Sequence, residues 1–247
     1  MATQFKPCVL VPVYNHEGPL PGIVARLKPY GLPCILVDDG SRESCAEVMR
    51  GLAARESWVR YIRMAPNRGK GRAVKAGLFA AEEQGFSHAI QIDADGQHDI
   101  GDLGKFIDAA NARPEAVVTG LPIFDESMPK GRYYARYLTH AWVWINTLSL
   151  RIRDSMCGYR VYPVAVCADL LRRERLGDRM QFDVEILVRL HWQGAEIVSI
   201  PTRVAYPEDG VSHFRPWLDN VLISRMHAGL FFGMLARLPR LIGRRFG

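Results

Sequence analysis

Short apolar runs alternate with helical patterns through the first half of the chain, and this alternation restricts the fold most strongly. The apolar runs lie at 8–13, 34–37, 59–64, 88–92 and 116–119, and helical patterns occupy 22–28, 45–55, 70–84 and 100–112. This order is typical of a parallel sheet whose strands are joined by crossover helices. Continuous hydrophobicity within the runs indicates strands that are covered on both faces. We therefore predict an α/β fold with a mostly parallel sheet flanked by helices.

The second half of the chain is less regular. It contains an aromatic helix candidate at 133–150, a DSMCGYR loop at 154–160, a helix at 181–193 and a strand at 195–200. An apolar and basic segment follows. We predict one domain over 1–215 and a separate tail over 216–247.

Composition narrows the class of protein without naming a function. The five cysteines form no CxxC pair, which argues against a disulfide framework and a zinc site. The net charge of +6 suits phosphate-bearing substrates, nucleic acid or an anionic membrane surface. The longest charge-free apolar stretches, 137–150 and 226–236, are shorter than the ~20 residues that span a bilayer. The first seven residues also lack the apolar core of a signal peptide, so we expect a cytoplasmic location.

Acidic side chains follow the predicted strand at 88–92 in the sequence DADGQH. Asp93 and Asp95 carry like charges that repel each other unless a cation or several donors lie between them. Hard oxygen ligands at this spacing suit Mg²⁺ or Mn²⁺ bound together with substrate phosphates. A solvated turn is the alternative for an isolated Asp-x-Asp, but the position at the end of an apolar strand favours a ligand site, as does the Gly96 turn.

Two further polar segments have the chemistry of a nucleotide site. In DDGS, Asp38 and Asp39 can accept hydrogen bonds from a base or ribose. In NRGKGRAVKAGL, Lys70 lies at the start of a helix, where cations and free amides can engage a diphosphate. A helix cap in the first segment and a solvated basic turn in the second are the structural alternatives. Neither GxGxxG nor a P-loop occurs.

These motifs together resemble those of a known family. VPVYNHE, LVDDGS, NRGKGRAVKAGL, DADGQH, DSMCGYRVY and FDVEILVRLHWQGAEIVSIP occur in the order typical of family 2 glycosyltransferases. The pattern covers roughly residues 8–213 and is most similar to the dolichol-phosphate-mannose-synthase-like subgroup and to bacterial glycolipid enzymes. The resemblance implies a GT-A fold, a nucleotide-sugar donor, a divalent metal and inversion at the anomeric carbon.

The resemblance also implies roles for individual residues. Asp95 and Gln97 would ligate the metal. Asp154 and Arg160 would organise the acceptor side. Together with Lys70, the residues that would bind the nucleotide-sugar are Pro12, Tyr14, Glu17, Val37, Asp39, Asp93 and Ala94.

An inverting transfer to a hydroxyl also needs a general base. Asp183 and Glu185, in FDVE, hold the place in the chain where other members have an acidic base, although acids are favoured at any helix N-terminus. His213 is a third candidate, as a base or an orienting group. A phosphate acceptor would need no strong base, because its nucleophile is already ionised.

Two departures from the family pattern affect the acceptor. Members of the subgroup carry Gly-Ser-Arg after the fifth strand, where this chain has TGLP, and an R-x-x-G-x-S-K segment, where it has PEDGVSH. Pro207 and His213 thus stand in place of an arginine and a lysine. Fewer cations on that side weaken the case for a polyprenyl-phosphate acceptor.

The tail has the composition of a helix that lies in a membrane interface. Apolar residues recur through 222–238. The end of this stretch is basic, with arginines at Arg237, Arg240, Arg244 and Arg245. Such a helix suits an anionic membrane surface. Packing on the chain's own domain is the alternative.

We predict a metal-dependent inverting glycosyltransferase, using Mg²⁺ or Mn²⁺, that is peripheral on the cytoplasmic face of the membrane. It would move a sugar from a UDP- or GDP-linked donor to a lipid-associated acceptor in cell-envelope glycolipid or glycan synthesis. The alternatives are a polyprenyl-phosphate mannosyl or glucosyl synthase and, more distantly, a sugar nucleotidyltransferase. A non-enzymatic nucleotide-binding scaffold is disfavoured by the intact acidic motifs, and nucleic-acid binding rests only on the net charge.

Overall fold

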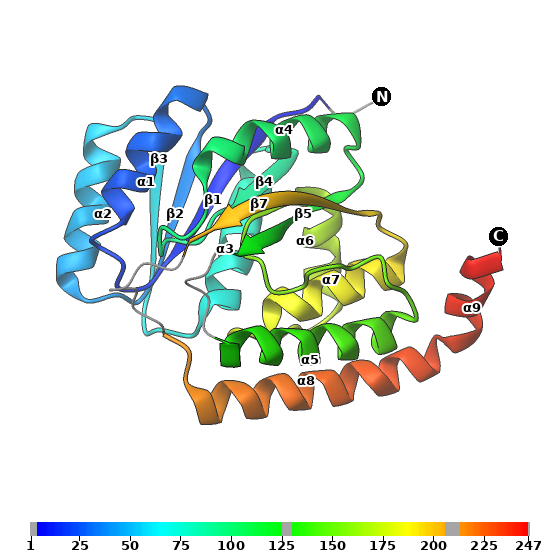
Figure 1. Ribbon diagram of the computed structural model, residues 1–247. Coiled ribbons are helices and arrows are strands. Elements are labelled where there is room, and N and C mark those ends of the chain that lie inside the picture. The colour runs from blue at the N-terminus through cyan, green and yellow to red at the C-terminus, as the bar shows by residue number, and fades with distance from the viewer. Residues whose placement is uncertain (1–3, 125–129, 206–212, 247) are drawn as a thin grey trace.

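A seven-stranded sheet forms the centre of the molecule, in the order β3-β2-β1-β4-β6-β5-β7. The computed structural model describes residues 4–124, 130–205 and 213–246 (Figure 1). Strand β6 pairs antiparallel with β4 and β5, and the other neighbouring pairs are parallel. The strands are β1 (Pro7–Val13), β2 (Cys34–Asp39), β3 (Val59–Met64), β4 (His88–Gln91), β5 (Val117–Phe124), β6 (Arg160–Pro163) and β7 (Ile197–Val204). The predicted mostly parallel α/β sheet is confirmed.

Helices cover both faces of this sheet. Strand β1 alternates between the faces: Leu10 belongs to one buried apolar cluster and Val9 and Val11 to the other. Helices α1 (Leu20–Leu27), α2 (Glu43–Arg55) and α4 (Leu103–Ala112) pack on the Val9 face. Helices α3 (Lys70–Glu83), α6 (Val164–Arg173) and α7 (Phe182–Gln193) pack on the Leu10 face, and α5 (Lys130–Thr147) adds Val143 to that cluster. The two sides of the sheet thus bury separate cores.

The order of the strands creates a topological switch point at one edge of the sheet. Strands β2 and β3 lie on one side of β1, in that order outward. The next strand, β4, lies on the other side of β1. Ligands of open α/β sheets bind at such a switch point, beyond the carboxyl ends of the strands. YNHE and DADGQH follow β1 and β4, and DDGS begins with the last two residues of β2, so all three lie at this edge.

The region around residues 160–173 forms two elements that the sequence patterns did not indicate. Strand β6 is only four residues long, and α6 follows it at once. The continuous apolar character of VYPVAV fits either a strand or a helix, because the run is too short to show a period. The predicted strand at 116–119 also continues to Phe124.

The C-terminal segment forms α8 (Pro216–Ala236) and α9 (Leu238–Phe246). Figure 1 shows α8 alongside α5, with α9 turned away from its line. Met226, Leu230 and Met234 of α8 are buried in the cluster on the Leu10 face. Trp217 and Phe232 on the same helix are exposed, so α8 is apolar on its outer side as well. Within the described residues, no helix is both long and apolar enough to cross a membrane.

The loop before β6 passes very close to the end of β4. A Cβ atom on Gly158 would lie 1.9 Å from Asp93 Oδ2, and Asp93 is itself held by Lys70 Nζ at 2.7 Å. Any side chain at position 158 would therefore displace the carboxylate. Glycine at this position lets two segments of the chain meet at the sheet edge.

We predict that Gly158→Ala lowers the free energy of unfolding by about 2 kcal/mol, because the added methyl group overpacks this contact. Gly229→Ala is a matched control, since a Cβ there has nothing within 4 Å. That change in the interior of α8 should stabilise the protein by about 0.5–1 kcal/mol. Urea denaturation of both variants measures the difference, and equal stability of the two would contradict the close contact.

Candidate active site

Lys70 holds two carboxylates together near the switch point of the sheet. Its Nζ lies 2.7 Å from Asp93 Oδ2 and 2.7 Å from Asp183 Oδ2. The three side chains come from the start of α3, the end of β4 and the first turn of α7, and each is at most 20% exposed. Burial opposes charge on Lys70, but the two carboxylates raise its pKa above the ordinary lysine value. We call Lys70, Asp93 and Asp183 the ion cluster.

Asp93 has further neighbours that keep it ionised. Burial alone would raise its pKa, but the charge of Lys70 and a contact with His98 lower the pKa well below the usual aspartate range. His98 Nε2 lies 3.9 Å from Asp93 Oδ2, and Gln91 Nε2 donates to Oδ1 at 3.3 Å. His98 lies within the DADGQH motif but was not predicted as a site residue. Its burial against Tyr159 is a tertiary feature that the motif does not reveal.

Asp95 lies next to the ion cluster in a tight turn. Its Oδ1 accepts a hydrogen bond from the Gln97 amide at 3.0 Å, and Gly96 between them has a positive φ of 76°. No hydrogen bond to Oδ2 is found within the described residues. In that part of the chain no three His, Cys, Asp or Glu side chains gather closely enough to hold a metal ion. A cation on Asp95 would therefore take most of its ligands from a substrate and from water, which suits Mg²⁺ or Mn²⁺ beside phosphates.

Asp39 fixes the loop that leads into α3. Its two oxygens accept hydrogen bonds from the amides of Arg68 and Gly69, at 2.9 and 2.7 Å, and from Asn67 Nδ2 at 2.9 Å. Burial raises the pKa of Asp39 above its ordinary value, and the two amide bonds oppose that rise. The loop is the one that presents Lys70. Asp39 thus has a structural role at the same edge where we predicted contact with a base or ribose.

The remaining residues predicted to bind the nucleotide lie around β1 and β2. Pro12 and Val37 are paired across the two strands and are buried. The Val37 side chain is fully buried in the core on the Leu10 face. Ala94 is 2% exposed.

Aromatic rings and an ion pair lie beyond the end of β1. Tyr14 and His213 meet edge to face with ring centroids 4.8 Å apart, and burial lowers the pKa of His213. Glu17 is paired with Arg42 at 2.9 Å. Pro207 lies outside the described residues.

Asp154 and Arg160, the two residues predicted on the acceptor side, both fix the loop at 154–160. Asp154 binds the Arg136 guanidinium through both oxygens, at 2.6 Å each, and also contacts His140 Nε2 at 3.2 Å. Burial opposes its ionisation, but His140 and Arg136 together lower the pKa of Asp154 far below its ordinary value. The partners Arg136 and His140 were not predicted, because they come from another element, α5, and meet Asp154 only in the folded chain.

Arg160 ties that loop to the ion cluster. Its side chain is fully buried, with NH2 donating to the Ser155 carbonyl at 2.7 Å and NH1 to the Asp183 carbonyl at 2.6 Å. The guanidinium also lies 3.8 Å from Asp183 Oδ1. Arg160 therefore positions the first turn of α7.

The three candidate bases differ in what surrounds them. Asp183 is in the ion cluster, and within the described residues its buried Oδ1 accepts no hydrogen bond. Glu185 accepts from the Gly177 amide at 2.8 Å and from Arg189 at 2.7 Å, so both of its oxygens are engaged. The His213 ring packs against Tyr14 and His16 beyond the end of β1. The arrangement can bind a diphosphate through Lys70 and can accept a proton at Asp183.

Comparison with known proteins identifies the family of this chain. The family model described as glycosyl transferase family 2 matches residues 8–177. A polyprenol monophosphomannose synthase from Mycolicibacterium smegmatis is 27% identical over 83% of this chain and 79% of its own length. A dolichyl-phosphate beta-glucosyltransferase from Dictyostelium discoideum is 25% identical over 72% of this chain, which spans only 60% of that protein.

A solved structure shows the same fold at low identity. It is glucosyl-3-phosphoglycerate synthase from Mycobacterium tuberculosis, in complex with Mn²⁺ and uridine-diphosphate-glucose. The TM-score is 0.64 at 17% identity, over 95% of this chain and 79% of that one. With the family match covering most of the chain, the conclusion is plain: this protein belongs to glycosyl transferase family 2, has a GT-A fold and is a glycosyltransferase.

Proposed function

We propose that this enzyme transfers a sugar, with inversion, from a UDP- or GDP-linked donor to a lipid-associated acceptor in cell-envelope glycolipid or glycan synthesis. The observation that carries the proposal is the ion cluster at the switch point of the sheet, with Asp95 beside it. A lysine between two acids at that edge supplies both a partner for a diphosphate and a candidate proton acceptor. The Mycobacterium tuberculosis neighbour, whose complex contains a nucleotide-sugar, supports the donor class.

Asp95 and Gln97 would hold Mg²⁺ or Mn²⁺ against the donor. Within the described residues Asp95 Oδ2 accepts no hydrogen bond, and this oxygen and the turn at Gly96 fit a cation that is otherwise bound by phosphate oxygens. When bound, such a cation neutralises charge on the nucleoside diphosphate as it leaves. Lys70 adds a second positive charge at the same edge.

The nucleoside would lie over the ends of β1 and β2. Pro12, Val37 and Asp39 would border that surface, and Tyr14 would offer a ring at its rim. Glu17 would act there through its pair with Arg42. Asp93 and Ala94 would lie beside the ribose and the diphosphate.

Asp183 is the general base that we favour for a hydroxyl acceptor. Its Oδ1 is the oxygen with no hydrogen bond in the described structure, while Lys70 and Arg160 hold the rest of the group. Glu185 and His213 are less suited, because Glu185 is occupied by Arg189 and His213 lies against Tyr14. Asp154 and Arg160 would shape the acceptor side by fixing the loop at 154–160.

A phosphate acceptor is the second candidate. Two relatives are named for polyprenol-phosphate and dolichyl-phosphate substrates. An ionised phosphate is already a nucleophile and needs no base. The role of Asp183 therefore distinguishes the two acceptor classes.

We expect metal-dependent binding of either UDP or GDP to wild-type protein in calorimetry with Mn²⁺. Asp95→Ala should reduce that metal-dependent affinity at least about tenfold, because a charge-assisted contact contributes roughly 1.5–3 kcal/mol. Asp108→Ala, an exposed acid on α4, is the matched control and should bind as wild type does. Metal-dependent binding that survives Asp95→Ala would refute the metal role, and no binding of either nucleotide by folded protein would refute the donor class.

Asp183→Asn should reveal the acceptor class. With a hydroxyl acceptor, loss of the base should lower kcat by about 10²–10⁴-fold while leaving the Kd of the donor nearly unchanged. Asp108→Asn, which removes the charge of an exposed acid on α4, serves as the control for charge loss. A kcat of Asp183→Asn close to that of wild type would exclude Asp183 as the base and favour a phosphate acceptor.

We also propose that α5 and α8 rest on the cytoplasmic face of a membrane. These packed helices expose Tyr137, Leu138, Trp217 and Phe232. The fraction of Trp217 that is exposed, 85%, is unusual for a large apolar side chain. Aromatic side chains favour the interface of a bilayer, and the arginines of the tail favour anionic lipid.

Replacing Trp217 and Phe232 together by serine should weaken binding to anionic vesicles by about tenfold or more, since each ring buries apolar area on insertion. Co-sedimentation with phosphatidylglycerol vesicles measures this. The thermal unfolding temperature should not fall, because both side chains are exposed. Unchanged vesicle binding would show that this surface is not the contact.

A further inference from the structure

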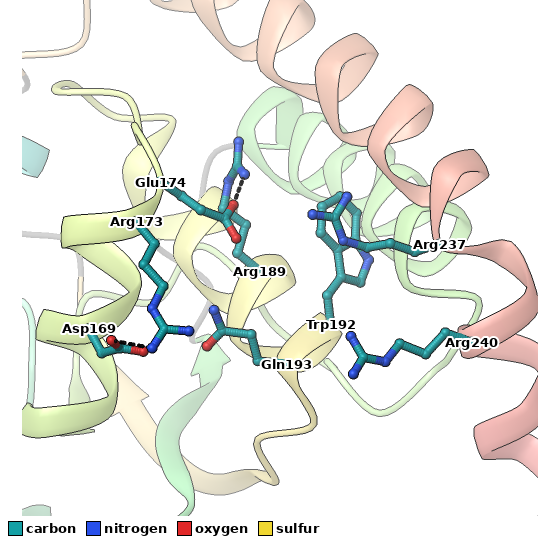
Figure 2. A pocket seen from close by; sticks show the side chains of 8 residues that line it. All are labelled: Asp169, Arg173, Glu174, Arg189, Trp192, Gln193, Arg237 and Arg240. Carbon is teal, nitrogen blue, oxygen red and sulfur yellow. Dashed lines mark hydrogen bonds and ion pairs between the residues drawn. The ribbon is translucent and has the colours of Figure 1, made fainter.

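A pocket rich in arginine lies outside the active site, where α6 and α7 meet the junction of α8 and α9. Its volume is about 430 Å³. Figure 2 shows side chains from all three regions pointing into the same space. The pocket is lined by Asp169, Arg173, Glu174, Arg189, Trp192, Gln193, Arg237 and Arg240.

The positive charge of this pocket is only partly neutralised. Arg173 pairs with Asp169 at 2.8 Å, and Arg189 pairs with Glu174 and with Glu185. Within the part of the chain that the structure describes, neither Arg237 nor Arg240 has an ion pair. The C-terminal ends of α6 and α7 attract cations and account for arginines on those helices. These helix ends do not account for Arg237 and Arg240, which come from the C-terminal segment.

Arg237 is held in place before any ligand binds. Its guanidinium lies 4.7 Å from the centre of the Trp192 ring, and NH1 donates to the Gly233 carbonyl at 3.0 Å. Trp192 is itself 4% exposed and donates to the Asn146 carbonyl at 2.9 Å. A Cβ on Gly233 would lie 2.8 Å from Trp192 Cη2, so glycine is what lets α8 approach the ring. A guanidinium fixed on an aromatic ring is a pre-organised donor.

Arg240 completes the site from α9. It is exposed, and Figure 2 shows its side chain extending toward the space beside Gln193. Two guanidinium groups without carboxylate partners that face one cavity match the geometry of a phosphate, which accepts paired N–H donors. We propose that this pocket binds a phosphate-bearing anion, and that the bound anion ties α9 to α6 and α7.

The pocket is separate from the proposed reaction centre. Asp183 lies in the first turn of α7 and Trp192 in its last turn, so about 14 Å of helix lies between them. The inference therefore does not depend on the proposed function. The phosphate can belong to a soluble compound or to a lipid headgroup, and the two sources call for different probes.

The test compares Arg240→Gln with Arg225→Gln. Both residues are exposed on the C-terminal helices and both changes remove one positive charge, but Arg225 does not line the pocket. Arg237 is left intact, because its loss would disturb the Trp192 packing and the fold. The soluble probe is inorganic phosphate, followed by thermal unfolding. The lipid probe is phosphatidylcholine vesicles with phosphatidic acid, compared with phosphatidylcholine alone.

We expect the Arg240→Gln protein to bind one of these probes about tenfold more weakly than the Arg225→Gln protein does. A loss of this size corresponds to the loss of one hydrogen bond to a charged group. A selective loss of stabilisation by inorganic phosphate identifies a soluble ligand. A selective loss of binding to phosphatidic acid vesicles identifies a lipid headgroup. If Arg240→Gln is no weaker than Arg225→Gln toward either probe, the pocket is not an anion site and the proposal is overturned.

Discussion

The contact of Lys70 with Asp93 and Asp183 is the interaction on which the site depends. It joins the start of α3, the end of β4 and the start of α7, which are separated by long stretches of chain. Two carboxylates at this spacing would repel each other in a buried place without a cation between them. The lysine makes their closeness stable.

Several buried contacts keep this ion cluster in place. Asp39 fixes the loop that carries Lys70, and Arg160 holds the first turn of α7 through the Asp183 carbonyl. Gly158 leaves room for Asp93. The contacts of Asp39 and Arg160 satisfy polar groups that would be costly if left unpaired in the interior. The ion cluster is thus supported by residues that hold the backbone in position.

The sequence predicted the sheet and the edge at which the site lies, because apolar runs and the acids after them are local patterns. DADGQH and DDGS were placed correctly at the ends of β4 and β2. Partners were harder to predict. Nothing in FDVE distinguishes Asp183, which meets Lys70, from Glu185, which meets Arg189. Strand β6 escaped prediction because four residues show no period, and Arg136 and His140 contact Asp154 only through the tertiary fold.

Strand β6 runs antiparallel to β4, and the position of Arg160 beside the candidate site depends on this pairing. Arg160 begins β6 and pairs with Gln91, the last residue of β4, so the chain enters the sheet where the acidic segment leaves it. Val161 and Tyr162 face different cores. A slip of one residue in this pairing would exchange those faces and turn Arg160 away from Asp183. The register of β6 therefore determines which of its side chains are buried in each core. It also determines whether Arg160 can hold Asp183 beside Lys70.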